Sequence, residues 1–382
     1  MRASSRSVAL EALARVRGGA YANLVVPSIL DARGATLSDR DKAFATTLAY
    51  GAIRMARACD WLVDRHVRVG HRKDLDPDVR DVLRLGAYQL AFLGTPPHAA
   101  VSETVNLAPQ RARGLVNAVL RQVATEVAKG SPPWPDIATR LSYPVWIVER
   151  LNADLGEEVA EAALRMMDEP ARVSERLDGY VQDLSSQWVV EALAAQPGEV
   201  VLDLCAAPGG KATALANSGA WVVAADRSVT RTGLVASNVA KLGLANVCPV
   251  VADGRHAPLR PGSFDRVLVD APCSGLGVLR RRPDARWRIQ PEDVESLARL
   301  QRQLLLAGAA LARPGGVLAY SVCTMTSAET CAIDAWLSRS TPQLEALDPP
   351  GQPWEPLGRG ARLLPQTAGT DGMYLLLLRV PG

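Results

Sequence analysis

The stretch VVLDLCAAPGGKATALA, from Val200 to Ala216, decides the fold of the second half of this chain. An apolar run leads into Asp203, a loop of small residues follows, and a helix-like run begins near Lys211. A short apolar run that ends in a turn signal is typical of a buried parallel strand. In doubly wound sheets, ligands bind beyond the carboxyl ends of such strands, where glycines allow close approach to the backbone. The spacing favours a nucleotide-like ligand over a glycine turn that binds nothing.

Two common nucleotide loops do not fit this stretch. The phosphate loop of nucleotide hydrolases needs a glycine five residues before the Gly-Lys pair and a serine or threonine after it. Cys205 and Ala212 occupy those positions. The dinucleotide pattern GxGxxG is also absent, so the ligand belongs to another class.

Strands and helices alternate after Pro197, which predicts a mostly parallel sheet covered by helices on both faces. The expected strands are 200–204, 221–225, 247–251, 266–269, 317–321 and 372–380. The expected helices between them are 209–217, 230–242, 291–312 and 327–337.

The residues before about Gly130 predict an all-helical domain without strands. Ser4 or Ser5 can cap the first helix, and Asp76-Pro77-Asp78 is a typical helix start. The Pro-rich stretch 131–135 predicts a rigid linker and a domain boundary. We therefore expect domains at 1–130 and 181–382, joined by a helical connection at 131–180.

Composition restricts the possible partners. The 382 residues carry a net charge of only +3, so any contact with nucleic acid must come from local basic patches. The six cysteines form no CxxC pair, and we expect no metal site. Free thiols without a secretory signal predict a cytoplasmic protein, and no long apolar span predicts a membrane helix.

Aspartates follow the predicted strands of the second half. Asp203, Asp226, Asp253 and Asp270 would lie at one edge of the sheet, where ligands bind in this architecture. A single aspartate in such a place is more often a helix cap, but four in register favour a ligand site. Asp226 is placed to accept hydrogen bonds from ribose hydroxyls, and Asp253 could meet an adenine amino group. Without GxGxxG, the pattern favours S-adenosylmethionine over a dinucleotide.

Two cysteines also lie at predicted strand ends. Cys273 lies in the loop DAPCSG and Cys323 in YSVCT. A thiolate is a strong nucleophile once its pKa is lowered. Cytosine C5 accepts a methyl group only after a nucleophile adds to C6, and a base must then remove the C5 proton. Two cysteines at one edge of a sheet suit that pair of tasks.

A basic segment, LRRRPDARWR, follows Cys273 at residues 279–288. Arginines bind phosphates in bidentate fashion and an aromatic ring can stack on an unpaired base. A solvated basic loop is the alternative, but the position favours RNA contact. The residues concerned are Arg280, Arg281, Arg282, Arg286, Trp287 and Arg288.

Together these motifs resemble the bacterial ribosomal RNA cytosine-C5 methyltransferases of the RsmB (Sun, Fmu) type. LDLCAAPGGKATALA, DAPCSGLGVLRRRPDARW, YSVCTMTSAE and TDGMYLLLLR resemble motifs of its catalytic domain. RSVALEALARV, SDRDKAFATTLAYGAIR, VRDVLRLGAYQLAFL and GLVNAVLR resemble its NusB-like helical domain. The resemblance implies a Rossmann-type class I methyltransferase domain, mostly of parallel strands, preceded by an all-α NusB-like domain that binds RNA.

The resemblance also implies roles for individual residues. Cys323 would be the nucleophile and Cys273 the release partner, with Asp270 between cofactor and target base and Lys211 at the rim. S-adenosylmethionine would be held by Asp226, Asp253, Asp270 and the loop of Cys205, Ala206, Ala207, Pro208, Gly209, Gly210 and Lys211. The expected partner is small-subunit ribosomal RNA, and we expect a monomer.

The sequence departs from the family pattern most clearly between Glu169 and Tyr180. Family members carry several tens of residues there, which form a small RNA-recognition-like subdomain. Either the protein has a truncated form of that subdomain, or the sequence as given leaves part of it out. Val322, Thr330 and Met373 also replace the usual threonine, asparagine and aromatic residue. A methyltransferase that acts on transfer RNA stays open as an alternative. So does an RNA-binding, antitermination-like protein whose methyltransferase domain is idle.

Overall fold

The computed structural model describes residues 4–33, 37–72 and 74–382. The chain forms two compact units. The first runs to Glu149 and includes Arg281–Arg288, and the second comprises Arg150–Arg280 and Ile289–Gly382. The predicted boundary near residue 130 thus falls inside the first unit. The segment Arg281–Arg288, which the sequence analysis places in the catalytic domain, belongs to the first unit by its contacts.

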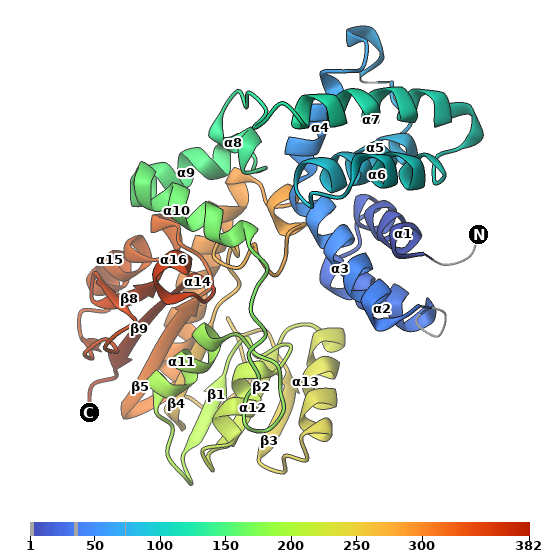
Figure 1. Cartoon of the computed structure of the whole chain (residues 1–382). Coiled ribbons are helices and arrows are strands. Elements are labelled where there is room, and N and C mark those ends of the chain that lie inside the picture. The colour runs from blue at the N-terminus through green and yellow to red at the C-terminus, as the bar shows by residue number, and fades with distance from the viewer. Residues whose placement is uncertain (1–3, 34–36, 73) are drawn as a thin grey trace. The chain divides into compact units, whose positions relative to one another are not determined.

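The first unit is helical throughout its described residues (Figure 1). Ser4 caps α1 through a hydrogen bond from the Ser7 amide, and Asp76 caps α5 ahead of Pro77, as the sequence predicts. Its helices are α1 (Ser5–Arg17), α2 (Ala22–Arg33), α3 (Asp39–Arg54), α4 (Ala56–Asp64), α5 (Pro77–Ala91), α6 (Pro97–Val105), α7 (Arg113–Val127) and α8 (Ile137–Arg140), with 3-10 turns η2 (Val69–His71), η3 (Gln110–Ala112) and η4 (Ala285–Trp287).

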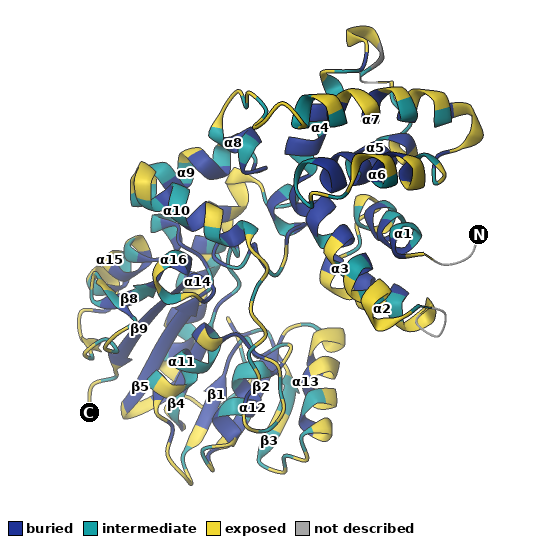
Figure 2. Ribbon diagram, viewed as in Figure 1, coloured by how far each residue is buried: buried dark blue, intermediate teal, exposed yellow. Residues whose placement is uncertain are grey.

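Apolar side chains at helical spacing form the core of this unit. Val8, Leu48, Leu62, Leu83 and Leu120 come from five different helices and are fully buried. Figure 2 shows the buried residues on the sides of the helices that face one another. Burial of these faces is what stabilises short helices that would be marginal in isolation.

The second unit is built on one mixed sheet, in the order β3-β2-β1-β4-β5-β9-β8-β7, with β6 also paired to β9. The five strands β1 to β5 pair in parallel, and β6 to β9 add antiparallel pairs. The strands are β1 (Val200–Asp203), β2 (Trp221–Asp226), β3 (Val247–Val251), β4 (Phe264–Asp270), β5 (Ala312–Val322), β6 (Glu345–Ala346), β7 (Glu355–Leu357), β8 (Gly360–Leu363) and β9 (Met373–Arg379).

Helices cover both faces of this sheet and bury two separate cores (Figure 1). Neighbouring residues of β1 alternate between them, since Val201 packs with the α12 side and Leu202 with the α14 side. The helices are α9 (Val145–Leu155), which spans the boundary between the units, α10 (Glu157–Asp168), α11 (Leu184–Leu193), α12 (Gly210–Ala216), α13 (Val229–Lys241), α14 (Pro291–Leu311), α15 (Cys331–Ser340) and α16 (Pro365–Ala368), with the turn η5 (Ser327–Glu329).

The predicted α/β architecture is confirmed. The main strands lie within a few residues of their expected positions, except that β5 begins at Ala312 instead of Val317. Ala312 was expected to be the last residue of the preceding helix and 313–316 its closing turn, but 312–316 form an irregular start of β5, with Ala312 paired to Phe264. The short strands β6, β7 and β8 were not predicted. The sheet is thereby extended on the side of β9, away from the predicted site.

Candidate active site

The carboxyl ends of the parallel strands bring the predicted site residues to one edge of the sheet. Asp203, Asp226 and Asp270 are the last residues of β1, β2 and β4, and Cys323 directly follows β5. Because β2, β1, β4 and β5 are neighbours in the sheet, their ends form one continuous row. This is where ligands bind in open parallel sheets.

Cys273 and Cys323 face each other at this edge. Their Sγ atoms lie 3.3 Å apart, within hydrogen-bonding distance for thiols. The hydrogen bond to Cys323 and burial raise the pKa of the Cys273 thiol well above its usual range, and the charge of Glu329 adds to the effect. These effects favour the protonated form of the Cys273 thiol.

Lys211 and Asp270 form a partly buried ion pair beside the cysteines. The Lys211 ammonium donates to Asp270 Oδ2 at 2.7 Å, and the Ser321 hydroxyl donates to Asp270 Oδ1 at 3.0 Å. Burial alone would lower the pKa of Lys211, but the charges of Asp270 and Cys323 outweigh it and raise the pKa. Lys211 therefore stays charged and stabilises an anionic sulfur on Cys323.

Asp203 is a buried carboxylate without a well-formed hydrogen bond to any described side chain or backbone group. It is 1% exposed, and neither side-chain oxygen has a partner. Burial raises its pKa to about 7, and the negative charge of Asp270 adds to this rise. Lys211 and the backbone amide of Cys205 act in the opposite direction. A cationic ligand near β1 would relieve this cost.

The glycines of the loop after β1 are explained by contacts within the protein. Gly209 has φ of +105°, and a Cβ there would lie 3.3 Å from the Val235 backbone. A Cβ on Gly210 would lie 3.1 Å from the Gln182 amide nitrogen. Burial raises the pKa of the Cys205 thiol far above its usual range, which suits packing instead of nucleophilic attack. The remaining loop residues, Ala206, Ala207 and Pro208, connect β1 to these contacts.

The two other predicted cofactor aspartates already have partners in the protein. Asp226 is 4% exposed and accepts a hydrogen bond from the Ser228 amide, with Arg231 at 3.4 Å. Asp253 pairs with Arg255 through both carboxylate oxygens, and hydrogen bonds from Arg255 lower the pKa of Asp253. Asp226 keeps acceptor capacity for a hydroxyl donor, whereas Arg255 would share Asp253 with any ligand.

The structure corrects the expectation that the whole basic segment presents itself to RNA. Arg280 is buried and pairs with Asp371 at 2.7 Å and Asp183 at 3.3 Å in the second unit. Arg286 is fully buried in the first unit, with its guanidinium 3.9 Å from the centre of the Tyr143 ring. Both side chains hold the fold together, because a buried cation needs such partners.

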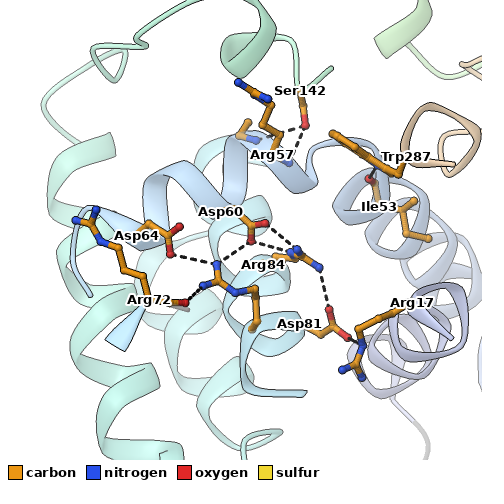
Figure 3. Close-up of polar contacts among 12 residues, drawn as sticks. Arg17, Ile53, Arg57, Asp60, Asp64, Arg72, Asp81, Arg84, Ser142 and Trp287 are labelled. Carbon is orange, nitrogen blue, oxygen red and sulfur yellow. Dashed lines mark hydrogen bonds and ion pairs between the residues drawn. The ribbon is translucent and has the colours of Figure 1, made fainter. Parts of the chain in front are cut away.

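Trp287 and Arg288 also contact the helical unit. The Trp287 indole donates to the Ile53 carbonyl at 2.8 Å, as Figure 3 shows beside the ion pairs of Asp60, Asp81 and Arg84. Arg288 donates to the Gly19 carbonyl at 2.9 Å. Arg281 is half-buried and Arg282 is exposed, so Arg282 is the member of the predicted set that most clearly faces solvent.

Two residues of this edge, Ser321 and Glu329, escaped the sequence reasoning as site members, and Asp203 was placed at the edge without an individual role. Glu329 is 0% exposed and accepts hydrogen bonds from Ser274, next to Cys273, and from Thr326, three residues after Cys323. Its position six residues after Cys323 was visible, but the sequence alone does not show that the side chain turns inward. The described residues contain no cluster of His, Cys, Asp and Glu that could hold a metal, and no described helix is long and apolar enough to cross a membrane.

The parallel strands β3-β2-β1-β4-β5, with helices on both faces, define a Rossmann-type α/β fold. The structure superimposes on the solved structure of PH0851 with a TM-score of 0.79 at 22% identity, over 99% of both chains. It also resembles a methyltransferase homolog from Pyrococcus horikoshii, with a TM-score of 0.54 at 24% identity, over 65% of this chain and 99% of that one. At such identities the likeness shows the fold alone.

Sequence comparisons identify the family. The model of the 16S rRNA methyltransferases RsmB/F matches residues 190–379, and that of the NusB family matches residues 3–125. The chain is 39% identical to a Mycobacterium tuberculosis protein whose name proposes a methyltransferase and gives no substrate, over 98% of this chain and 96% of that one. It is 35% identical to the ribosomal RNA small subunit methyltransferase B of Thermus thermophilus, over 99% and 98%. The chain belongs to the RsmB/F family of S-adenosylmethionine-dependent 16S rRNA methyltransferases, with a NusB-type helical domain.

Proposed function

We propose that this chain transfers a methyl group from S-adenosylmethionine to C5 of a cytosine in 16S ribosomal RNA. The observation that carries the proposal is the 3.3 Å separation of the Cys273 and Cys323 sulfurs at the carboxyl edge of the sheet. Methylation at a cytosine carbon needs a nucleophile for C6 and a base for the proton on C5. Two thiols at this distance can act on the same cytosine, one as the nucleophile and the other as the proton acceptor.

The residues present fit the cofactor. S-adenosylmethionine supplies a methyl group that carries positive charge on its sulfonium sulfur. Asp203 offers two buried oxygens without partners to a cationic group, and the buried carboxylate of Asp226 can accept from ribose hydroxyls. Cys205 to Lys211 would line the same ligand, with Asp253 at the adenine and Asp270 between cofactor and base.

Cys323 is the proposed nucleophile. Lys211 interacts favourably with a negative charge on the Cys323 sulfur. The charge of Glu329 favours the protonated form of Cys273. Attack by the Cys323 thiolate would form a bond to C6 and make C5 electron-rich. C5 could then bond to the methyl carbon while the bond from that carbon to the sulfonium sulfur breaks and its electron pair returns to the sulfur. Asp270 and Lys211 are paired at 2.7 Å beside the proposed nucleophile.

Cys273 is the proposed release partner. Once the Cys323 sulfur is bonded to C6, it no longer carries charge and no longer shares a proton with Cys273. The two contributions of Cys323 that raise the pKa of Cys273 are then lost. Cys273 can give up its proton to solvent and accept the one from C5. The electrons of that C–H bond then form the C5–C6 double bond, and the Cys323 thiolate leaves.

RNA contact is proposed for the helical domain and for the exposed part of the basic segment, with Arg282 as its most accessible arginine. The helical unit and its NusB match favour ribosomal RNA, as does the small-subunit substrate named for relatives at up to 35% identity across nearly the whole chain. We propose that the chain acts as a monomer.

Bisulfite sequencing of ribosomal and transfer RNA from cells with and without the gene tests this function. The proposal expects a cytosine in 16S rRNA that loses its methyl group in the deletion strain and regains it with the wild-type gene. Complementation with Cys323→Ala should not restore it, although the variant should still bind S-adenosylmethionine in calorimetry. Loss of methylation only in transfer RNA, or no loss at all, would contradict the 16S assignment. No loss would favour an idle methyltransferase domain.

A further inference from the structure

A buried carboxylate, Glu329, connects the loop that contains Cys273 to the loop that contains Cys323. Glu329 is the last residue of η5 and is 0% exposed. It accepts hydrogen bonds from the Ser274 amide at 2.8 Å, the Ser274 hydroxyl at 2.5 Å, the Thr326 hydroxyl at 2.8 Å and the Gln301 amide at 3.0 Å. Every partner donates, which is the pattern of an ionised carboxylate.

Two partners of Glu329, Ser274 and Thr326, lie in the loops that carry the reacting sulfurs. Ser274 follows Cys273 directly, and its hydroxyl lies 2.8 Å from the hydroxyl of Thr324, which follows Cys323. Thr326 lies two residues further along the same loop. The carboxylate therefore bonds one loop twice and the other once, with the Ser274–Thr324 contact as a direct link.

A second layer holds Glu329 in turn. Gln301 of α14 donates to the Pro272 carbonyl at 2.9 Å as well as to Glu329. The Tyr320 hydroxyl donates to the Gln301 side-chain oxygen at 2.9 Å and is also 2.7 Å from the Glu329 carbonyl. These contacts leave the Cys273 loop fixed on both sides of the sulfur, at Pro272 and at Ser274.

We propose that Glu329 is a positioning residue that holds Cys273 at the distance from Cys323 required for the release step. The inference rests on the proposed function of the cysteine pair. Glu329 bonds Ser274 through both backbone and side chain, so its loss displaces the Cys273 loop more than the Cys323 loop. Because the hydrogen-bond donors around Glu329 are all buried, replacement of the carboxylate leaves donors without an acceptor.

Glu329 also affects the chemistry of Cys273 through its charge. After the hydrogen bond to Cys323 and burial, a negative charge at Glu329 contributes to the raised pKa of Cys273. A thiol with a raised pKa gives a stronger base once it is ionised. Position and charge thus act on the same sulfur.

Glu329→Gln tests the inference, with Asp334→Asn as the matched control. Asp334 is another buried carboxylate of this unit, but its partner is Arg359, and it lies outside the network of the cysteines. With small-subunit rRNA as substrate, Glu329→Gln should lower turnover on the order of 10- to 100-fold, since small misplacements of reacting groups cost that much. It should accumulate the covalent RNA adduct on denaturing gels, with unchanged S-adenosylmethionine affinity. Asp334→Asn should lower stability without adduct.

A second measurement does not depend on activity. In a Cys323→Ser background, iodoacetamide should alkylate Cys273 several-fold faster when Glu329→Gln is added, because the loop is released and the opposing charge is removed. Addition of Asp334→Asn should leave that rate unchanged.

The two measurements separate the outcomes. A wild-type protein that methylates no RNA would overturn the proposed function, and the alkylation rates would still decide the role of Glu329. An active wild type, with no adduct in Glu329→Gln and equal alkylation rates, would overturn the positioning role.

Discussion

Replacement of Asp203 by asparagine should stabilise the catalytic unit at alkaline pH. The carboxylate lies at the end of β1, is 1% exposed and has no partner for either oxygen. Burial is the main reason that its pKa rises from 3.8 to about 7. Asparagine has nearly the same shape and no charge, so it keeps the packing and removes the cost of ionisation.

The sign and size follow from proton linkage. The folded protein holds the Asp203 proton more tightly than the unfolded chain does. The stabilising effect of that proton is complete below the unfolded pKa near 4 and is lost as the pH rises through about 7. Between pH 5 and pH 8 the wild type should lose about 3 kcal/mol relative to Asp203→Asn, since each pKa unit corresponds to about 1.36 kcal/mol. The largest difference in unfolding free energy is expected at pH 8.

Urea unfolding of both proteins at pH 5 and pH 8, with hydrogen exchange of β1 peptides as the local probe, measures this difference. Asp334→Asn serves as control, because its carboxylate is paired with Arg359 and its loss should destabilise the protein at pH 8. Parallel pH dependences for the wild type and Asp203→Asn would refute the reasoning. They would mean that the Asp203 carboxylate is already compensated.

Two further outcomes are expected. Cys273→Ala should accumulate a covalent RNA–protein adduct that denaturing gels detect, because Cys323 still attacks but the C5 proton is not removed; an adduct-free Cys273→Ala protein with normal turnover would exclude the release role. Trp287→Ala should destabilise the helical unit by about 2–4 kcal/mol, through lost packing and the lost hydrogen bond to Ile53, as measured by hydrogen exchange of α3. Trp221→Ala, at a residue that is 58% exposed, should change stability by less than about 0.5 kcal/mol, and equal effects of the two substitutions would contradict the burial argument.

The sequence predicted the sheet edge well because its signals are local. An apolar run that ends in aspartate marks β1, β2 and β4, and parallel pairing then places their ends together. The close approach of Cys273 and Cys323 follows from the same logic, since β4 and β5 are neighbours. Only the distance between the sulfurs needed the structure.

The errors arose where burial depends on distant residues. Charge in the segment 279–288 was visible, but the partners that bury Arg280 and Arg286 are Asp371 and Tyr143, each far away in sequence. A run of arginines has the same pattern whether it faces water or a buried carboxylate. Glu329 was overlooked for the same reason, because its inward orientation depends on Ser274 and Gln301.

The connection before the catalytic domain, at residues 131–180, includes contacts to the loop after β1. The alignment with the Mycobacterium tuberculosis relative spans 449 positions although this chain has 382 residues, so that relative contains residues without counterparts here. The connection still contacts the loop after β1, since Arg176 donates to the Gly210 carbonyl at 2.6 Å and stacks over Tyr180 at 4.7 Å.

A chain without these contacts would leave the loop at Gly210 uncovered. The connection in this chain therefore contributes contacts that shape the proposed cofactor loop. RNA contact is proposed for the helical unit and Arg282. Removal of the Arg176 side chain should accordingly lower the affinity for S-adenosylmethionine more than the affinity for RNA.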